Sequence, residues 1–248
     1  MVDNISFSDA IERAGISYYE HNGIGTLSEK MMHRVLKFYF DKDSSKHEID
    51  YLGYVADILN EEGIIEIQTS SFSKLVPKLQ CFLEQNKVRV VYPIVERKNI
   101  IKIDRCSGES FPSRKSPKQG HPWDALYEIS CIRDLLPNEN LTVTVVFLDA
   151  IETRMKQGSR KVGRKRTEKI DILPTKINSI IDLHNPKDYL SLLPEKLPPE
   201  FTASEFEKHT KIKGIRKQGA LMLLLKLGVL DREKGDGRAY VYSLKRTE

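Results

Sequence analysis

Two carboxylates and a carboxamide are closely spaced in the segment VADILNEEGIIEIQT, residues 55–69. The segment is predicted to form two short β-strands around a turn that ends at Gly63. In that register Asp57 lies directly opposite Glu66, and Gln68 shares a face of the second strand with Glu66. Opposed residues have Cβ atoms roughly 4.5–5.5 Å apart, where like charges destabilise a sheet. A cation or a proton between the carboxylates relieves that repulsion, so the pattern predicts a metal site.

The segments on either side of this hairpin alternate between helix and strand patterns. Apolar residues at helical spacing predict helices within 25–40 and 71–85, and β-rich runs predict strands at 46–53 and 87–94. The run LTVTVVFLDA, residues 141–150, is expected to be the last strand of the same sheet. Two further elements are expected, a strand at 99–104 and an amphipathic helix at 121–140. The alternation predicts an α/β fold, a mixed sheet flanked by helices with its site at strand ends.

One string in this segment resembles the core signature of the PD-(D/E)XK nuclease superfamily: Asp57, eight intervening residues, then Glu66-Ile67-Gln68. The order of the helices and strands around the string is similar to that of the superfamily as well. The string is similar to the variant, found in some restriction endonucleases, in which Gln replaces the usual Lys. The resemblance covers roughly residues 25–150. It implies a restriction-endonuclease-like fold and a nuclease that depends on Mg²⁺ or Mn²⁺. The departure from Lys matters, because a neutral Gln could orient the attacking water but could not stabilise charge.

The resemblance assigns roles to particular groups in the hairpin. Asp57 and Glu66 would ligate the metal together with the backbone carbonyl of Ile67. Gln68 would orient the attacking water through its amide. Mg²⁺ prefers oxygen ligands and keeps several waters, which suits two carboxylates beside a phosphodiester.

The helices before and after the hairpin contribute further candidates. The superfamily often places an extra acidic residue on the preceding helix, and the resemblance gives that catalytic role to Glu29. Glu29 also fits a capping box that begins at Thr26, so both roles stay open. His33 is expected at the helix surface rather than as a ligand. Lys74 and Lys78, on the following helix, are expected on a solvated face.

Basic residues gather between positions 154 and 169, where RMKQGSRKVGRKRTEK holds eight Lys and Arg against one acid. Such a run is either a solvated linker or a phosphate-binding segment, and beside a nuclease core we favour phosphate binding. The candidate DNA contacts in this run are Arg160, Lys161, Arg164, Lys165 and Arg166. The loop with Arg114, Lys115 and Lys118 is also basic, and its charges are expected mainly to keep it soluble.

Residues 199–248 predict the order helix, turn, helix and β-hairpin, which resembles a winged helix-turn-helix. A capping box formed by Thr202 and Glu205 opens the first helix, and the second begins near Ile215. The candidate DNA contacts are Lys213, Arg216, Lys217 and Gln218 at the start of the second helix, and Lys234 and Arg238 at the wing. The same fold also packs proteins together, so DNA binding and protein binding both stay open.

These patterns divide the chain into four segments: a helical extension at 1–24, a nuclease-like domain at 25–152, a basic connector with short helices at 153–198, and the winged helix at 199–248. The hydrophobic fraction of 40% and the charged fraction of 30% are those of an ordinary globular protein. The three cysteines show no CxxC spacing, which argues against a disulfide framework or a zinc ribbon. With no apolar run long enough to span a bilayer, a cytoplasmic protein is expected.

The combined expectation is a metal-dependent nuclease that hydrolyses DNA phosphodiester bonds, with double-stranded DNA as its partner and a homodimer as one arrangement for cutting both strands. One rival is a DNA-binding or regulatory protein on a nuclease fold that has lost activity, which the missing Lys supports. Another is a protein-interaction module with a protonated carboxylate pair. P-loop, GxSxG, HExxH and dinucleotide-binding motifs are absent from the sequence, which argues against the enzyme classes that need them.

Overall fold

The computed structural model describes residues 4–21, 30–104, 107–156, 167–235, 237 and 239–245, with side chains in the first helix described for residues 6–15. The strands are β1 (His47–Tyr51), β2 (Tyr54–Asn60), β3 (Gly63–Ile67), β4 (Val88–Asp104), β5 (Arg114–Lys115), β6 (Leu141–Lys156), β7 (Thr167–Leu183), β8 (Glu200–Thr202), β9 (Leu230–Lys234) and β10 (Tyr240–Leu244). The α-helices are α1 (Asn4–His21), α2 (Met31–Phe40), α3 (Val76–Leu83), α4 (Ala125–Ser130), α5 (Ala203–Thr210) and α6 (Gly214–Lys226). Short 3₁₀ helices are η1 (Ser44–Lys46), η2 (Phe72–Leu75), η3 (Pro122–Asp124) and η4 (Pro186–Leu192).

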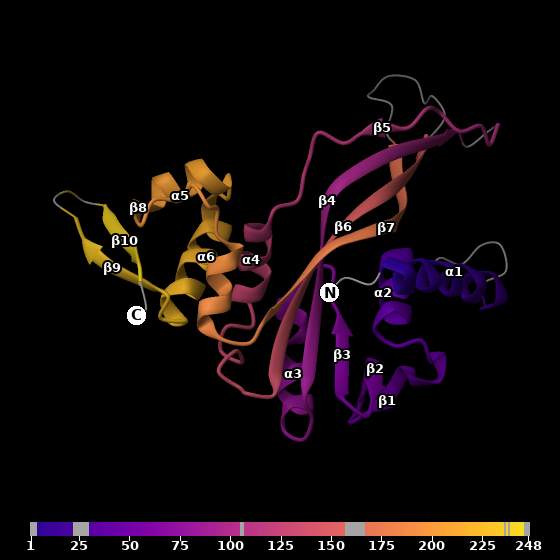
Figure 1. The fold of residues 1–248 in the computed structure, drawn as a ribbon, viewed down its shortest axis with the longest axis horizontal. Helices are drawn as coiled ribbons and strands as arrows, with labels where there is room; N and C mark the ends of the chain where they lie inside the picture. The colour runs from indigo at the N-terminus through magenta and orange to yellow at the C-terminus, as the bar shows by residue number, and fades with distance from the viewer. Residues whose placement is uncertain are drawn as a thin grey trace.

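A seven-stranded mixed sheet forms the centre of the molecule (Figure 1). Its strand order is β1-β2-β3-β4-β6-β7, with β5 paired to β4. Strands β3, β4 and β6 run parallel to one another, while the outer strands on both sides pair antiparallel. A second, three-stranded sheet has the order β8-β10-β9. The expected α/β class is therefore confirmed, and no described helix is long and apolar enough to cross a membrane.

The predicted hairpin is formed by β2 and β3. Ile58 pairs with Ile65, and Asn60 pairs with Gly63 across a tight turn. Gly63 has a φ of 127°, and a Cβ there would lie 2.3 Å from the carbonyl oxygen of Lys87. Only glycine fits this combination of positive φ and close backbone approach, so Gly63 fixes the register that brings Asp57 and Glu66 together.

The central strands are rich in valine because both of their faces are covered. The side chains of Val90, Val91, Val145 and Val146 are fully buried, as expected for parallel strands packed between two layers. Helices α1 and α2 cover one face, where Phe7, Val35 and Leu36 meet the sheet. Helix α3 covers the other face with Leu79 and Phe82. Strand β4 continues beyond the expected end at residue 94, and the separate strand expected at 99–104 is its continuation.

The prediction of a connector at 153–198 is wrong for the described residues of this segment. Residues 167–183 form the long strand β7, which pairs antiparallel with β6 and makes β6 an internal strand. Strand β7 ends the sheet and carries Pro174 within it. Proline is tolerated on such an edge strand because one side of the strand has no ladder to complete. The only short helix in this described stretch is η4.

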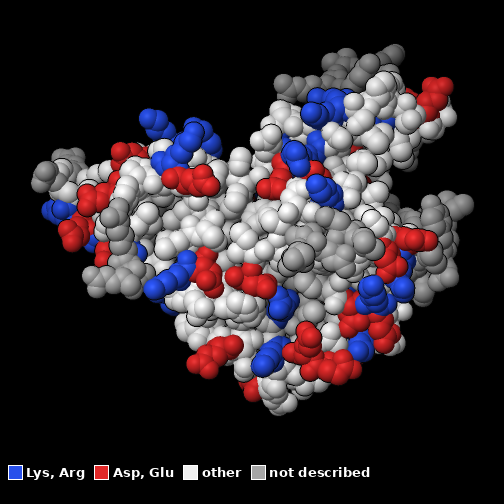
Figure 2. All heavy atoms as spheres, viewed as in Figure 1, with Lys and Arg blue, Asp and Glu red and all other residues white. Residues whose placement is uncertain are grey.

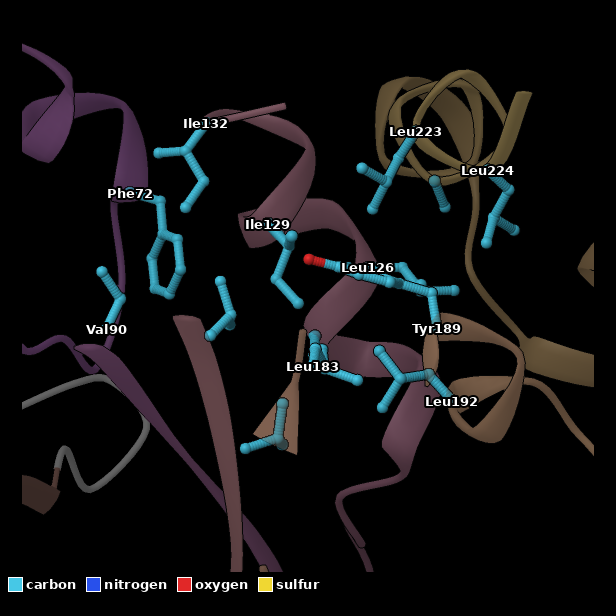
Figure 3. Packing of buried hydrophobic residues seen from close by; sticks show 14 of the residues in the cluster. Phe72, Val90, Leu126, Ile129, Ile132, Leu183, Tyr189, Leu192, Leu223 and Leu224 are labelled. Carbon is cyan, nitrogen blue, oxygen red and sulfur yellow. The ribbon is translucent and has the colours of Figure 1, made fainter. Parts of the chain in front are cut away.

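The helix expected at 121–140 is much shorter than predicted, since only η3 and α4 form within it. Helix α4 lies between the main sheet and α6 (Figure 3), where its side chains Leu126 and Ile129 are fully buried. The hydrophobic cluster that contains these two residues reaches from Val90 on β4 to Leu224 on α6. The C-terminal helices thus share one core with the sheet instead of forming a detached domain.

Candidate active site

Strands β2 and β3 place Asp57 and Glu66 side by side, as the turn geometry predicted. The backbone amide of Ile67 donates to Oδ2 of Asp57 at 2.7 Å. In return, the backbone amide of Asp57 donates to Oε1 of Glu66 at 3.3 Å. Each carboxylate therefore accepts a hydrogen bond from the neighbouring strand, and the orientation of both groups is set by the backbone of the hairpin.

Burial and mutual repulsion separate the proton affinities of the two carboxyl groups. Burial raises the pKa of Glu66, and the charge of Asp57 raises it further, to about 7. Burial also opposes ionisation of Asp57, but hydrogen bonds from His33 and the amide of Ile67 outweigh it and lower the pKa of Asp57. Two neighbouring carboxyl groups with opposite shifts are characteristic of catalytic sites.

Lys78 on α3 contacts the Glu66 carboxylate, so the expectation that Lys78 lies on a solvated face is wrong. Its ammonium group lies 2.5 Å from Oε2 of Glu66, and its side chain is 16% exposed. The same ammonium group lies over the ring of Phe82, 5.6 Å from the ring centroid. Lys74, one turn earlier, is exposed as expected. No sequence signal separates Lys78 from Lys74, because each directly precedes a buried leucine of the apolar stripe.

His33 on α2 contacts the other carboxylate, and the expected surface position is wrong for this residue too. Its Nε2 lies 3.1 Å from Oδ2 of Asp57, and its side chain is 23% exposed. The amide of Ile67 contacts the same oxygen. The structure thus brings together two acids and two basic side chains from four elements, β2, β3, α2 and α3.

The remaining catalytic candidates are placed differently. The side-chain amide of Gln68 donates to the carbonyl of Ser70, in the loop that leaves β3. Its backbone amide donates to Val91 at 2.9 Å, which fixes the start of that loop on β4. No described contact joins Gln68 to either carboxylate, so its role with water stays a prediction. Glu29 lies outside the described residues.

Asp57 and Glu66 together supply carboxylate oxygens, the ligand type that a hard divalent cation prefers. Burial and the charge of Asp57 raise the pKa of Glu66, although the Lys78 ammonium contacts its Oε2. Mg²⁺ needs only one or two protein carboxylates because waters complete its octahedral shell. Within the described ranges, no group of three or more His, Cys, Asp and Glu side chains could hold a metal ion. The ligand role of the carbonyl of Ile67 stays a prediction.

The C-terminal elements follow the predicted order of helix, turn, helix and β-hairpin. Thr202 and Glu205 form the expected capping box at the start of α5, with Oγ1 of Thr202 accepting from the amide of Glu205 at 3.3 Å. The Lys217 ammonium pairs with Glu207 at 2.7 Å, so this lysine joins α6 to α5. The guanidinium of Arg216 lies 5.2 Å from the ring centroid of Tyr127 on α4.

The other DNA-contact candidates divide into two groups. Lys213, Gln218 and Lys234 have exposed side chains. Arg160, Lys161, Arg164, Lys165, Arg166 and Arg238 lie outside the described residues. The acid site therefore rests on contacts in the structure, whereas DNA binding by these basic residues stays a prediction.

A family comparison matches residues 30–184 to the family described as Domain of unknown function (DUF8091). The chain belongs to this family. The DUF8091 region spans α2 to β7 and contains Asp57, Glu66, Lys78 and His33. The two C-terminal helices lie after it.

A relative of this DUF8091 protein occurs in Treponema pallidum (strain Nichols), where it is described as an uncharacterized protein. The two chains are 31% identical over 223 residues, which cover 88% of this chain and 86% of the relative. The aligned span is longer than the DUF8091 region, so the likeness extends beyond it. No solved structure matches this chain.

Proposed function

We propose that this protein is a metal-dependent nuclease that hydrolyses DNA phosphodiester bonds, with the helix-turn-helix holding the substrate. The observation that carries the proposal is the buried pair of Asp57 and Glu66 with the ammonium group of Lys78 on Glu66. Glu66 lies near the C-terminal end of β3, which pairs parallel with β4, and ligands of open α/β sheets bind at that end of the strands.

The main argument against a nuclease is the absence of Lys from the hairpin motif. Lys78 supplies a cation that could take the place of that Lys. A cation is present at the acid pair, but it comes from α3 and not from β3. In the proposed reaction, the ammonium group of Lys78 stabilises negative charge that develops on the phosphoryl oxygens. With a cation bound, Glu66 would stay ionised and act as a ligand, because a neighbouring positive charge lowers the pKa of a carboxyl group.

Asp57 and Glu66 would hold Mg²⁺ or Mn²⁺, and the bound ion would lower the pKa of a water and polarise the phosphoryl oxygen. His33 holds the Asp57 carboxylate in place through Oδ2. The basic residues of 154–169 and of α6 would bind the phosphates of double-stranded DNA, and that binding should weaken as salt rises.

The test is cleavage of supercoiled plasmid and of single-stranded DNA in Mg²⁺, Mn²⁺ or EDTA. Cleavage is expected only with metal, and Asp57→Asn and Glu66→Gln are expected to reduce it to the level seen in EDTA. Glu62→Gln is the matched control, because Glu62 is an exposed carboxylate in the same hairpin. Its cleavage should equal that of the unaltered chain.

Two results would replace the proposal with a rival. Intact DNA in every lane, together with metal-independent retention in a gel-shift assay, would identify a DNA-binding protein on a silent nuclease fold. Intact DNA without salt-dependent retention would identify a protein-interaction module.

A further inference from the structure

A large cavity lies between the central sheet and the C-terminal helices. Its volume is about 1060 Å³, and its walls come from residues 92–95 of β4, the segment 118–128 and the segment 209–216. The space-filling view shows this face of the molecule hollowed between the C-terminal helices and the long strands, with basic and acidic side chains on both sides (Figure 2). The first turn of α6, expected to meet a DNA groove, lines this cavity through Lys213 and Arg216.

The walls of the cavity are held by specific contacts. The amide of Gly120 donates to Val95 at 3.0 Å, and a Cβ at Gly120 would lie 2.5 Å from the same carbonyl oxygen. The indole Nε1 of Trp123 donates to the carbonyl of Thr210 at 2.9 Å, which ties this wall to the end of α5. The cavity is thus a built feature of the fold and not a gap between loose segments.

The cavity carries an excess of positive charge. Lys118, Lys211 and Lys213 line it and form no ion pair with the described residues. Of the acids that line it, Asp124 accepts from the amide of His121 at 2.9 Å, and Glu128 accepts from the amide of Phe72 at 3.2 Å. Both carboxylates keep their charge, but five Lys and Arg side chains line the cavity against these two acids, so an excess of positive charge remains to attract an anion.

Aromatic rings lie among these cations. The imidazole of His121 stacks on the indole of Trp123, with ring centroids 4.6 Å apart and planes inclined by 13°. Tyr92 and Tyr127 line the same cavity. Basic side chains interleaved with aromatic rings are the means by which proteins hold single-stranded nucleic acid, because the rings stack on bases and the cations meet phosphates.

The cavity begins close to the acid pair. Ser70 lines it, and the carbonyl of Ser70 accepts the side-chain amide of Gln68, two residues after Glu66. Tyr92 lines it as well, next to Val91, whose carbonyl accepts the backbone amide of Gln68. The cavity therefore borders the loop that leaves β3 after Glu66, whereas Asp57, Glu66 and Lys78 themselves lie outside its lining.

We propose that this cavity binds an unpaired strand of nucleic acid, with bases stacked against the His121 and Trp123 rings and phosphates on Lys118, Lys211 and Lys213. Base pairing hides the faces of the bases within a duplex, so the rings distinguish an unpaired strand from a paired one. The inference rests on the proposed function, because it names the strand presented to the nuclease site.

Trp123 is the only tryptophan of the chain, so its fluorescence reports stacking in the cavity directly. The full-length protein is titrated in EDTA with oligothymidylate, with oligouridylate of equal length, with a blunt hairpin duplex of equal phosphate number, and with polyglutamate. The single strands are expected to change the Trp123 emission, whereas the duplex, bound elsewhere on the protein, is expected to leave it unchanged. A preference for deoxythymidylate or for uridylate supports the inference equally and identifies the source of the strand.

The charge reversals Lys118→Glu and Lys211→Glu together are expected to weaken single-strand binding by about tenfold or more. The matched control reverses Lys187 and Lys196, which are exposed lysines outside the cavity lining. This control should bind as the unaltered chain does. An equal change in Trp123 emission with duplex and single strand, no change in Trp123 emission with the single strands, or stronger binding of polyglutamate would each overturn the inference.

Binding in EDTA separates this inference from the nuclease proposal. The variant with Asp57→Asn and Glu66→Gln is expected to bind the single strand at least as tightly as the unaltered chain. Single-strand binding without metal-dependent cleavage would overturn the nuclease proposal and support the cavity assignment. Cleavage without a change in Trp123 emission would support the nuclease proposal and overturn the cavity assignment.

Discussion

At the residue scale, the site depends on two carboxyl groups that share one hairpin but have different surroundings. Asp57 accepts from His33 and from the amide of Ile67 and stays ionised, because these contacts outweigh its burial. Glu66 is more deeply buried beside that negative charge, and its pKa rises to about 7 despite the Lys78 ammonium. In the metal-free protein, Asp57 is therefore ionised near neutral pH, while the pKa of Glu66 lies close to that pH.

Replacing Lys78 by Met tests the cation on Glu66. We expect the cleavage rate to fall by about 100-fold or more, because a charge aimed at the reacting phosphate is lost. Lys74→Met is the control, since Lys74 is exposed on the same helical segment and its replacement should leave the rate unchanged. The measurement is single-turnover cleavage of plasmid DNA, with circular dichroism to verify folding. Equal rates for the two variants would contradict the role of Lys78.

The raised pKa of Glu66 predicts how stability depends on pH in the metal-free protein. The folded chain keeps this proton up to a pKa of about 7, whereas the unfolded chain releases it near the ordinary 4.5. Between these values the folded state binds more protons, so the contribution of Glu66 lowers the free energy of unfolding as pH rises. Urea unfolding in EDTA should show a weaker decline for Glu66→Gln than for the unaltered chain. Glu62→Gln should keep the full decline, and an identical pH dependence for Glu66→Gln would contradict the assignment.

At the element scale, the placement of the site depends on how helices are anchored to the sheet. Helix α3 supplies Lys78, and its position is fixed by the fully buried Leu79 and Phe82. Helix α4 is short, but its buried side chains fill the space between the sheet and α6 (Figure 3). Helix α6 lies close against α4, and a Cβ at Gly219 would come within 2.8 Å of Oγ of Ser130. The cavity therefore depends on the packing of both C-terminal helices.

The capping box of α5 gives a test at this scale. Thr202→Ala removes the acceptor for the amide of Glu205 and the hydroxyl that donates to its carboxylate. We expect the free energy of unfolding to fall by about 1 kcal/mol. Ser204→Ala, at an exposed position of the same helix, is the control and should change stability much less. Chemical denaturation measures both, and equal effects would argue against the cap.

At the scale of the whole molecule, one hydrophobic cluster joins the sheet to the C-terminal helices. Val90 and Val143 of the sheet belong to the same cluster as Phe206 and Leu223 of α5 and α6. A boundary at residue 198, which the composition predicted, would cut through this core. The physical unit is therefore larger than the DUF8091 region at 30–184.

The shared core predicts that the full chain unfolds in one transition, seen together by Trp123 fluorescence and far-ultraviolet circular dichroism. A fragment ending at residue 198 is expected to expose the apolar side of α4 and to bind a hydrophobic dye. Leu224→Ala in the full chain removes a fully buried side chain of α6 and should cost about 2–5 kcal/mol. Both probes should shift together in that variant. Separate transitions, or a fragment as stable as the full chain, would contradict the shared core.

The features that sequence patterns predicted correctly depend on contacts between nearby residues. The turn at Gly63 fixes the pairing of Ile58 with Ile65, and the capping box of α5 is complete within four residues. Both follow from local backbone geometry, which a short segment determines by itself. The opposition of Asp57 and Glu66 is a consequence of the same turn.

Tertiary structure decided the features that join distant segments. Strand β7 was missed because it lies at the edge of the sheet, where Pro174 and exposed polar side chains are tolerated and no clean alternation is required. Lys78 and His33 resemble ordinary helix-surface residues in the sequence, and only packing of α3 and α2 against the sheet brings them to the acid pair. The cavity joins β4 to α6 through the shared core, a long-range arrangement that no local pattern encodes.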